Sequence, residues 1–264
     1  VSNNFYINGR PTYCVSDSTV TPVGTTADEG RMSPRNLLAT CIGDMLKMAT
    51  DGRSKVIGIS LKDRAAILPA GFAADGAYWW GKKAGHFVTS TYYRNDLPEW
   101  VKRVNREVQV KSGTNVFTSV VGVTKTFQLA DAAIDNEQLG QDSITDLLTI
   151  SVSSTDAIGH TYGTRGTENH DVYMELDRQV AAFLKTLDEK VGRGNYLVFL
   201  SADHGASHNP NLLKQRHIPA GGLEMWNWVK PVEQKLEARF GFAPVILNVS
   251  NNVVFLNHAG AAKA

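Results

Sequence analysis

The fold class follows from three consecutive segments: the apolar run DLLTISVSS (residues 146–154), the pattern HDVYMELDRQVAAFLKTLDEKV (170–191) and the second run NYLVFLSADHG (195–205). Both runs begin with short apolar stretches, which are typical of strands covered on both faces of a parallel sheet. The middle segment repeats its apolar residues at the spacing of one helical face. Together the three segments predict a strand-helix-strand crossover, with its second strand at Tyr196 to Ser201.

A similar helix and strand precede this unit. Ser33 and Pro34 introduce RNLLATCIGDMLKMAT, and they predict the N-cap and first turn of an amphipathic helix that ends near Asp51-Gly52. The run KVIGIS (55–60) follows as a short buried strand. The alternation of helices and strands predicts an α/β fold with a mostly parallel central sheet flanked by helices.

The remaining segments set the expected domain organisation. We expect one α/β domain over residues 1–264, with an inserted cap at 70–142 that contains a hairpin-like aromatic pair of strands, GAYWWGKKAGHFVTS (76–90). Near the carboxyl terminus the pattern predicts a helix from about Leu223 to Phe240, followed by two paired strands within APVILNVSNNVVFLN (243–257).

Composition excludes several classes of protein. With 42% hydrophobic and 20% charged residues, the chain is unlike disordered, collagenous or coiled-coil sequences. Its 27 Lys and Arg balance 26 Asp and Glu, so no broad field favours duplex nucleic acid or an anionic membrane. No apolar run has the length of a membrane span. Cys14 and Cys41 fit either one disulfide or two buried thiols.

Two pairs of acidic and imidazole side chains follow the strands of the predicted crossover. Asp156 and His160 are four positions apart, so on one helical turn they can reach the same Zn²⁺. Asp203 and His204 follow the second strand. Each pair alone also fits a capping or packing role. Because ligands gather at the carboxyl ends of parallel strands, the two pairs together predict a two-metal hydrolytic site.

A cationic pair follows the strand at 55–60. If the extended geometry continues, Lys62 and Arg64 point to one side and Asp63 points away. An ammonium and a planar guanidinium aimed together suit phosphate oxygens, and arginine can bind two of them at once. The alternative interpretation is a solvated run of charges.

These three clusters, in this order, resemble the alkaline phosphatase superfamily in its nucleotide pyrophosphatase/phosphodiesterase branch, and above all the phosphate-irrepressible bacterial alkaline phosphatases. The matching stretches lie between residues 33 and 210: SPRNLL, SLKDRAAILPAG, SSTDAIGHTYG, DVYMELDRQV and FLSADHGA. The resemblance implies an alkaline phosphatase-like fold. It also implies the location typical of the family, the periplasm or the cell surface, so we expect a periplasmic or secreted bacterial protein.

The resemblance assigns roles to individual side chains. It implies two zinc ions per full-length active site, each held by one carboxylate and one imidazole of this chain: Asp156 and His160 at the first, Asp203 and His204 at the second. It implies three side chains that contact the phosphate: Lys62, Arg64 and, in the segment VSNNFY, Asn3.

The function expected from this resemblance is a zinc-dependent phosphoester hydrolase that acts on a small phosphorylated substrate. A phosphomonoesterase, an alkaline phosphatase, is the first expectation. A monoester has an additional non-bridging oxygen, which gives both Lys62 and Arg64 a partner. The alternative within the family is a phosphodiesterase or nucleotide pyrophosphatase.

The family also has a Thr or Ser nucleophile, an early Asp ligand and a late His ligand, and none of them is evident between Val1 and Ala264. Two residues per metal also fall short of the three or four protein ligands of a usual zinc site. We therefore expect the chain to be a fragment of a larger enzyme and to be inactive by itself. The rival hypothesis is a non-catalytic binding domain with the same fold.

Overall fold

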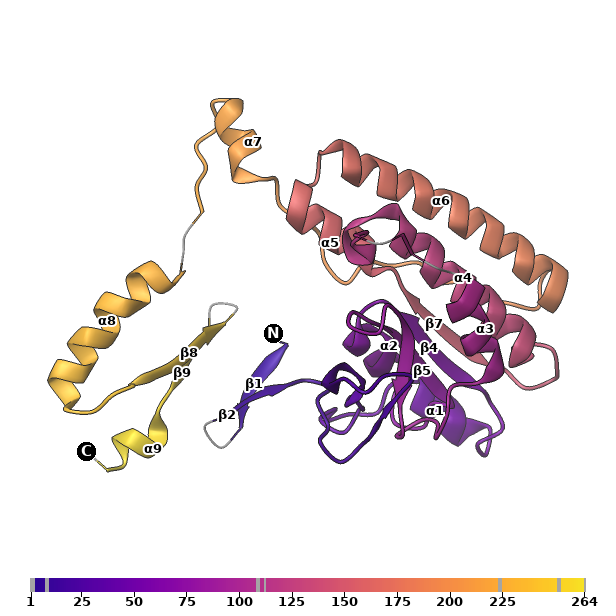
Figure 1. The fold of residues 1–264 in the computed structure, drawn as a ribbon, viewed down its shortest axis with the longest axis horizontal. Helices are drawn as coiled ribbons and strands as arrows, with labels where there is room; N and C mark the ends of the chain where they lie inside the picture. Colours follow the sequence, from indigo (N-terminus) through magenta and orange to yellow (C-terminus); the bar gives the residue numbers. More distant parts are fainter. Residues whose placement is uncertain are drawn as a thin grey trace. The chain divides into compact units, whose positions relative to one another are not determined.

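The computed structural model describes residues 3–7, 10–107, 110–111, 113–222, 225–250 and 253–263 (Figure 1). Two compact units make up the chain. Unit 1 consists of residues 1–14 and 209–264, and unit 2 consists of residues 15–208. The central sheet and the candidate site both belong to unit 2.

Unit 2 is built on a five-stranded sheet in the order β3-β6-β5-β4-β7. Its strands are β3 (Pro22–Val23), β4 (Val56–Ser60), β5 (Gly76–Gly81), β6 (His86–Ser90) and β7 (Leu147–Ser151). Strand β4 pairs in parallel with β5 and with β7, whereas β6 pairs antiparallel with β3 and with β5. The α/β class is confirmed, and the sheet is mixed, with its parallel part in β5, β4 and β7.

Helices flank this sheet (Figure 1). They are α1 (Ile42–Ala49), α2 (Asp63–Ala70), α3 (Glu99–Glu107), α4 (Val120–Asn136), α5 (Ser153–Tyr162) and α6 (Thr167–Leu187), with short turns η1 (Asp28–Gly30), η2 (Val116–Thr118) and η3 (Asp188–Gly192). Helix α4 packs along α6, and its other neighbours include α3 and β4. The largest core cluster joins the sheet residues Ile57, Ile59 and Tyr78 to Leu129 of α4, all fully buried.

The centre of β4 has room only for glycine. A Cβ atom on Gly58 would lie 2.0 Å from the carbonyl oxygen of Ala66. Helix α2 can therefore approach the face of β4 closely. This contact fixes where α2 begins relative to the end of the strand, and Lys62 lies in that connection.

The predicted start of the first helix is wrong. Helix α1 begins at Ile42 with Cys41 as its N-cap, and Asp44 completes a capping box there. Ser33 instead donates its hydroxyl proton to Asp17 Oδ2 at 2.6 Å and accepts the Arg35 amide proton at 3.1 Å. The Ser33 side chain is thus used in a buried loop contact, and the residue that caps the helix, Cys41, lies eight positions later.

The predicted strand at Tyr196 to Ser201 is also absent from the structure. Leu197, Phe199 and Leu200 are 78%, 84% and 80% exposed, and within the described residues no backbone hydrogen bond joins residues 197–200 to β7. Apolar composition indicates a preference for burial, but a strand also needs a hydrogen-bonded neighbour. Strand β7 is consequently an edge of the described sheet.

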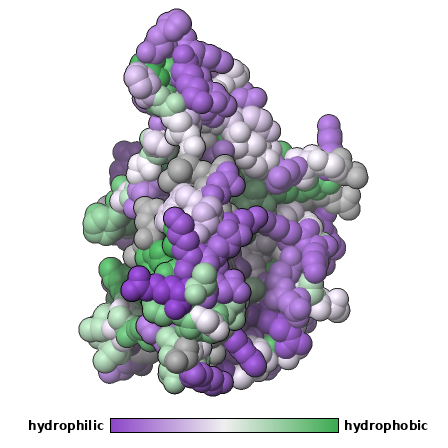
Figure 2. Space-filling view, turned by 90° about the vertical axis from the view of Figure 1, so that its left-hand side faces the viewer, coloured by the Kyte–Doolittle hydropathy of each residue, from purple (hydrophilic) through white to green (hydrophobic). Residues whose placement is uncertain are grey.

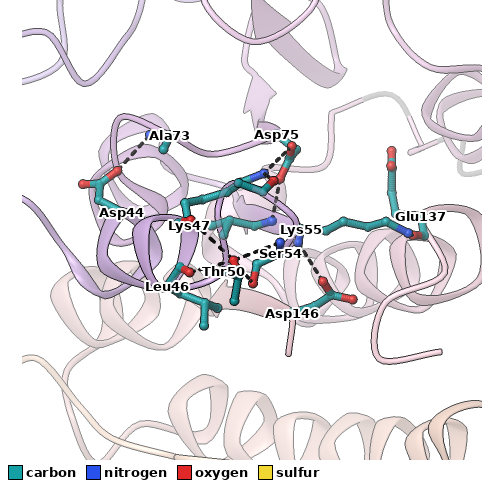
Figure 3. A network of polar contacts seen from close by, with 12 residues as sticks. Asp44, Leu46, Lys47, Thr50, Ser54, Lys55, Ala73, Asp75, Glu137 and Asp146 are labelled. Atoms are coloured by element: carbon teal, nitrogen blue, oxygen red, sulfur yellow. Dashed lines mark hydrogen bonds and ion pairs between the residues drawn. The ribbon is translucent and has the colours of Figure 1, made fainter. Parts of the chain in front are cut away.

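A polar network fixes the amino ends of the parallel strands (Figure 3). Asp75, just before β5, accepts the backbone amide of Val56 at 2.7 Å through Oδ2 and pairs with Lys47 Nζ at 2.8 Å through Oδ1. The fully buried Ser54 donates to the carbonyl of Thr145 at 2.6 Å and so links β4 to the segment before β7. These contacts lie at the end of the sheet opposite the candidate site.

Unit 1 contains two antiparallel strand pairs and three helices in its described part. Its elements are β1 (Asn4–Ile7), β2 (Arg10–Tyr13), α7 (Pro210–Gln215), α8 (Met225–Phe240), β8 (Ile246–Ser250), β9 (Val253–Leu256) and α9 (His258–Ala261). The expected carboxyl-terminal helix and strand pair are therefore present. Leu223 and the expected turn residues Asn251 and Asn252 lie outside the described residues.

The single domain over residues 1–264 and the cap at 70–142 stay predictions. In the structure, residues 70–142 supply β5, β6, α3 and α4 to unit 2, and the expected aromatic hairpin is the antiparallel pair β5 and β6. Within the described residues Cys14 is buried, Cys41 is partly buried, and neither is in a disulfide.

The surface is mixed in polarity. Figure 2 shows one face on which apolar groups alternate with hydrophilic ones. Searched over its described residues, the chain contains no helix with the length and apolar character of a membrane span.

Candidate active site

The site lies where two neighbouring parallel strands end. Ser60, the last residue of β4, is in register with Ser151, the last residue of β7. The segment with Lys62 leaves β4 at this edge, and α5, with Asp156 and His160, begins two residues after β7. The register of the sheet thus brings the SLKDR and SSTDAIGH segments together, as the sequence predicts.

Asp156 is the centre of the cluster. Its Oδ2 pairs with Lys62 Nζ, and its Oδ1 lies 3.1 Å from His160 Nε2 and 4.0 Å from His204 Nε2. Lys62 and Asp156 are both partly buried, with side chains 22% and 28% exposed. The structure therefore brings together four of the seven residues singled out from the sequence.

The electrostatics of the cluster favour an ionised carboxylate at Asp156. Burial by itself raises the pKa of Asp156, but the hydrogen bond and charge of Lys62, with smaller effects of His160 and His204, outweigh it and lower the pKa. The pKa of His204 is raised, first by the hydrogen bond of its ring to the Gly205 carbonyl and then by the charge of Asp203. The charge of Lys62 therefore favours the ionised form of Asp156, and the charge of Asp203 favours the protonated form of His204.

The second predicted pair reaches the cluster through its histidine. Asp203 is exposed, accepts the backbone amide of His204 at 3.1 Å and lies 3.6 Å from its Nε2. Because residues 197–203 form no strand, the carboxylate of Asp203 is held by its own neighbour rather than by the sheet. The two pairs are thus joined by the approach of His204 to Asp156.

The extended geometry on which the placement of Lys62 and Arg64 on one side depended does not continue past Lys62. Lys62 has an extended backbone (φ −92°, ψ 130°), but it is the N-cap of α2, which begins at Asp63. Asp63 accepts the backbone amide of Arg64 at 2.6 Å, and a carboxylate in the first turn favours the start of a helix. Arg64 is half-buried in that turn, and its predicted phosphate contact rests on the resemblance alone.

Asn3 belongs to unit 1, and the other six candidate residues belong to unit 2. The Asn3 side chain is exposed, and its backbone carbonyl accepts the Cys14 amide at 2.9 Å. Its phosphate contact stays a prediction.

Sequence reasoning gave no role to two buried hydroxyl groups below the cluster. Ser60 Oγ and Ser153 Oγ lie 2.9 Å apart, and they connect the end of β4 with the start of α5. The available signal was positional, because each serine falls at the end of a predicted buried strand and next to a segment with charged candidate residues.

The Asp and His side chains of the cluster are of the types that bind metal ions. Carboxylate oxygens and imidazole nitrogens are ligands that zinc prefers. Within the described part of the chain, however, no group of three or more His, Cys, Asp or Glu residues is placed to hold a metal ion. The donors are right in kind, but within the described residues they do not complete a metal site.

Comparisons with known proteins show the family to which the chain belongs. The family model for type I phosphodiesterase / nucleotide pyrophosphatase matches residues 1–237. The chain is 39% identical to alkaline phosphatase PafA of Elizabethkingia meningoseptica, over 94% of this chain and 55% of that protein. It is 38% identical to alkaline phosphatase PhoV of Synechococcus elongatus, over 84% of this chain and 50% of that protein.

A solved structure of known activity has the same fold. The crystal structure of wild-type alkaline phosphatase PafA matches with a TM-score of 0.91 at 38% identity, over 99% of this chain and 60% of that one. The chain thus spans about half to three-fifths of the length of the relatives it matches.

Proposed function

Because the chain belongs to the type I phosphodiesterase/nucleotide pyrophosphatase family, we propose that the full-length protein is a zinc-dependent hydrolase of small phosphate monoesters. The observation that carries the proposal is the cluster of Lys62, His160 and His204 around Asp156 at the carboxyl ends of β4 and β7. The similarity to two alkaline phosphatases supports the choice of a phosphatase.

Lys62 supplies positive charge for the phosphoryl group. Its ammonium is a compact cation with three donors, held at the edge of the sheet by a partly buried carboxylate. When substrate binds, it donates to a non-bridging phosphate oxygen, where charge develops during transfer. Arg64 and Asn3 complete the set of phosphate contacts that we propose, and Arg64 can bind two oxygens at once.

Zinc is part of the proposal for the full-length protein. Asp156 and His160 would contribute to one ion and Asp203 and His204 to a second, and bound zinc would supply Lewis-acid chemistry at the phosphate. The nucleophile is expected to be a Thr or Ser that this chain does not supply. We accordingly expect no turnover from the 264-residue chain alone.

A phosphodiesterase or nucleotide pyrophosphatase is the second candidate, because the matching family model carries that description. The two candidates differ at Lys62 and Arg64. A monoester has one more non-bridging oxygen than a diester. If one oxygen faces the proposed zinc ions, only the monoester leaves an oxygen for each of the two cations.

The deciding experiment compares p-nitrophenyl phosphate with bis(p-nitrophenyl) phosphate as substrates of the full-length protein. We expect a higher kcat/KM for the monoester and a loss of roughly 100-fold in Lys62→Ala, concentrated in the monoester reaction. Lys83→Ala, which removes an exposed lysine of the β5-β6 turn, is the matched control and should leave both reactions unchanged. A preference for the diester would contradict the proposed role of Lys62.

The periplasm or the extracellular space is the proposed location of the full-length protein, on the basis of the family resemblance. Fractionation of the source cells tests this, with phosphatase activity and an antibody to the chain as readouts. Recovery with the cytoplasmic fraction would contradict it.

A further inference from the structure

We propose that Ser60 and Ser153 are positioning residues that hold Lys62 at a fixed distance from Asp156 through a buried hydroxyl link. This inference rests on the proposed function, because it assigns the two serines a role through Lys62. Ser60 is fully buried and Ser153 is 4% exposed, so neither hydroxyl reaches a substrate.

Ser60 has a complete set of hydrogen bonds. Its Oγ donates to the carbonyl oxygen of Ser151 at 2.9 Å and accepts the backbone amide of Lys62 at 3.2 Å. The Ser153 hydroxyl, 2.9 Å away, donates the third bond in this assignment. A hydroxyl has one proton and two lone pairs, so these contacts use its whole capacity and leave one orientation.

Each serine is placed to orient one half of the site. Ser60 binds the Lys62 backbone directly, where the chain turns from β4 into α2. Ser153 is the first residue of α5, and Asp156 follows on the same helix one turn later. The Ser60-Ser153 bond therefore joins the backbone beneath the ammonium to the helix that bears the carboxylate.

Among the described contacts between these segments, the ion pair and the serine bond respond differently to substrate. The Lys62-Asp156 ion pair is partly exposed, and the ammonium must leave it, at least in part, to donate to a phosphate oxygen. The serine link is buried and takes no part in that exchange. It therefore keeps the two segments in place while the ammonium changes partner, which is the preorganisation that a phosphate-binding cation needs.

A double-mutant cycle on the full-length protein tests this, with kcat/KM for p-nitrophenyl phosphate as the readout. Ser60→Ala should lower kcat/KM about tenfold when Lys62 is present and less than about twofold in the Lys62→Ala background, because its effect passes through that lysine. Ser153→Ala removes only the hydrogen bond to Ser60 and serves as the milder variant. Its loss of kcat/KM should likewise depend on whether Lys62 is present.

Ser54→Ala is the matched control. Ser54 is also fully buried and also links β4 to the segment of β7, but at the opposite end of the strand. It should lower the melting temperature about as much as Ser60→Ala and leave kcat/KM within about twofold. An equal loss of activity in Ser54→Ala would overturn the inference, because a general loss of stability would then explain it.

The cycle separates the two proposals. If Lys62→Ala is impaired and Ser60→Ala costs the same factor with and without Lys62, the positioning role is refuted and the proposed function stands. If Lys62→Ala retains full activity, the proposed function of Lys62 fails, and the inference fails with it.

Discussion

Replacing Asp17 by asparagine should destabilise unit 2 by an amount that depends on pH. Asp17 is 5% exposed, and its carboxylate accepts hydrogen bonds from Ser33, Thr19 and Arg35. Burial by itself raises the pKa of Asp17, but these bonds outweigh it and lower the pKa from 3.8 to about 2. A difference of about 1.8 pH units, at about 1.36 kcal/mol per unit, corresponds to about 2.4 kcal/mol of unfolding free energy.

The sign of the pH dependence follows from the lowered pKa. The contribution of Asp17 is fully present above the unfolded pKa of 3.8 and is lost as the pH falls through about 2. The difference between wild type and Asp17→Asn should therefore be about 2 kcal/mol at pH 7 and roughly half of that at pH 3.

Urea unfolding followed by tryptophan fluorescence measures this difference at each pH. Asp28→Asn is the control, because Asp28 is 94% exposed and pairs with Arg31 only at the surface, where such pairs contribute under about 1 kcal/mol. A loss below about 0.5 kcal/mol in Asp17→Asn at pH 7, or one that does not shrink on acidification, would refute the reasoning.

Two further predictions concern the sheet that supports the site, and the same urea assay measures both. Gly58→Ala should lower the free energy of unfolding by about 3 kcal/mol, because its Cβ would lie 2.0 Å from a backbone oxygen of Ala66. The control Gly221→Ala, whose Cβ would lie in open space, should lower it by under about 0.5 kcal/mol. Similar losses in the two variants would contradict the close packing. Asp75→Ala should lower the free energy of unfolding by about 1 to 2 kcal/mol, because it breaks the bonds to Lys47 and to the start of β4 (Figure 3). An unchanged free energy of unfolding would show that the network does not anchor the strand.

The parallel strands β4 and β7 could be predicted because their residues carry a local signal. The runs at 55–60 and 146–154 are short and apolar, and both contain strands at the expected places. The run at 195–205 has the same composition, yet residues 197–200 are exposed and unpaired with β7. A local pattern reports the tendency of residues to be buried, whereas strand pairing depends on a neighbour distant in sequence.

The part of the site that depends on the order of the strands could be predicted from the sequence. Because β4 and β7 are parallel neighbours, Lys62 and Asp156 meet at one edge, and both were singled out. The extended geometry assumed for Lys62 to Arg64 does not continue, because helix α2 begins at Asp63. The Ser60-Ser153 bond depends on the register of the two strands, which the sequence of neither strand specifies.

The most direct test of the central claim is the zinc content per chain of the full-length protein, purified without chelator and measured by elemental analysis. The proposed function predicts about two zinc ions per chain in the wild type, fewer in Asp156→Ala, and an unchanged content in the exposed control Asp28→Ala. An active wild-type protein without zinc, or a zinc content that Asp156→Ala does not change, would contradict the account.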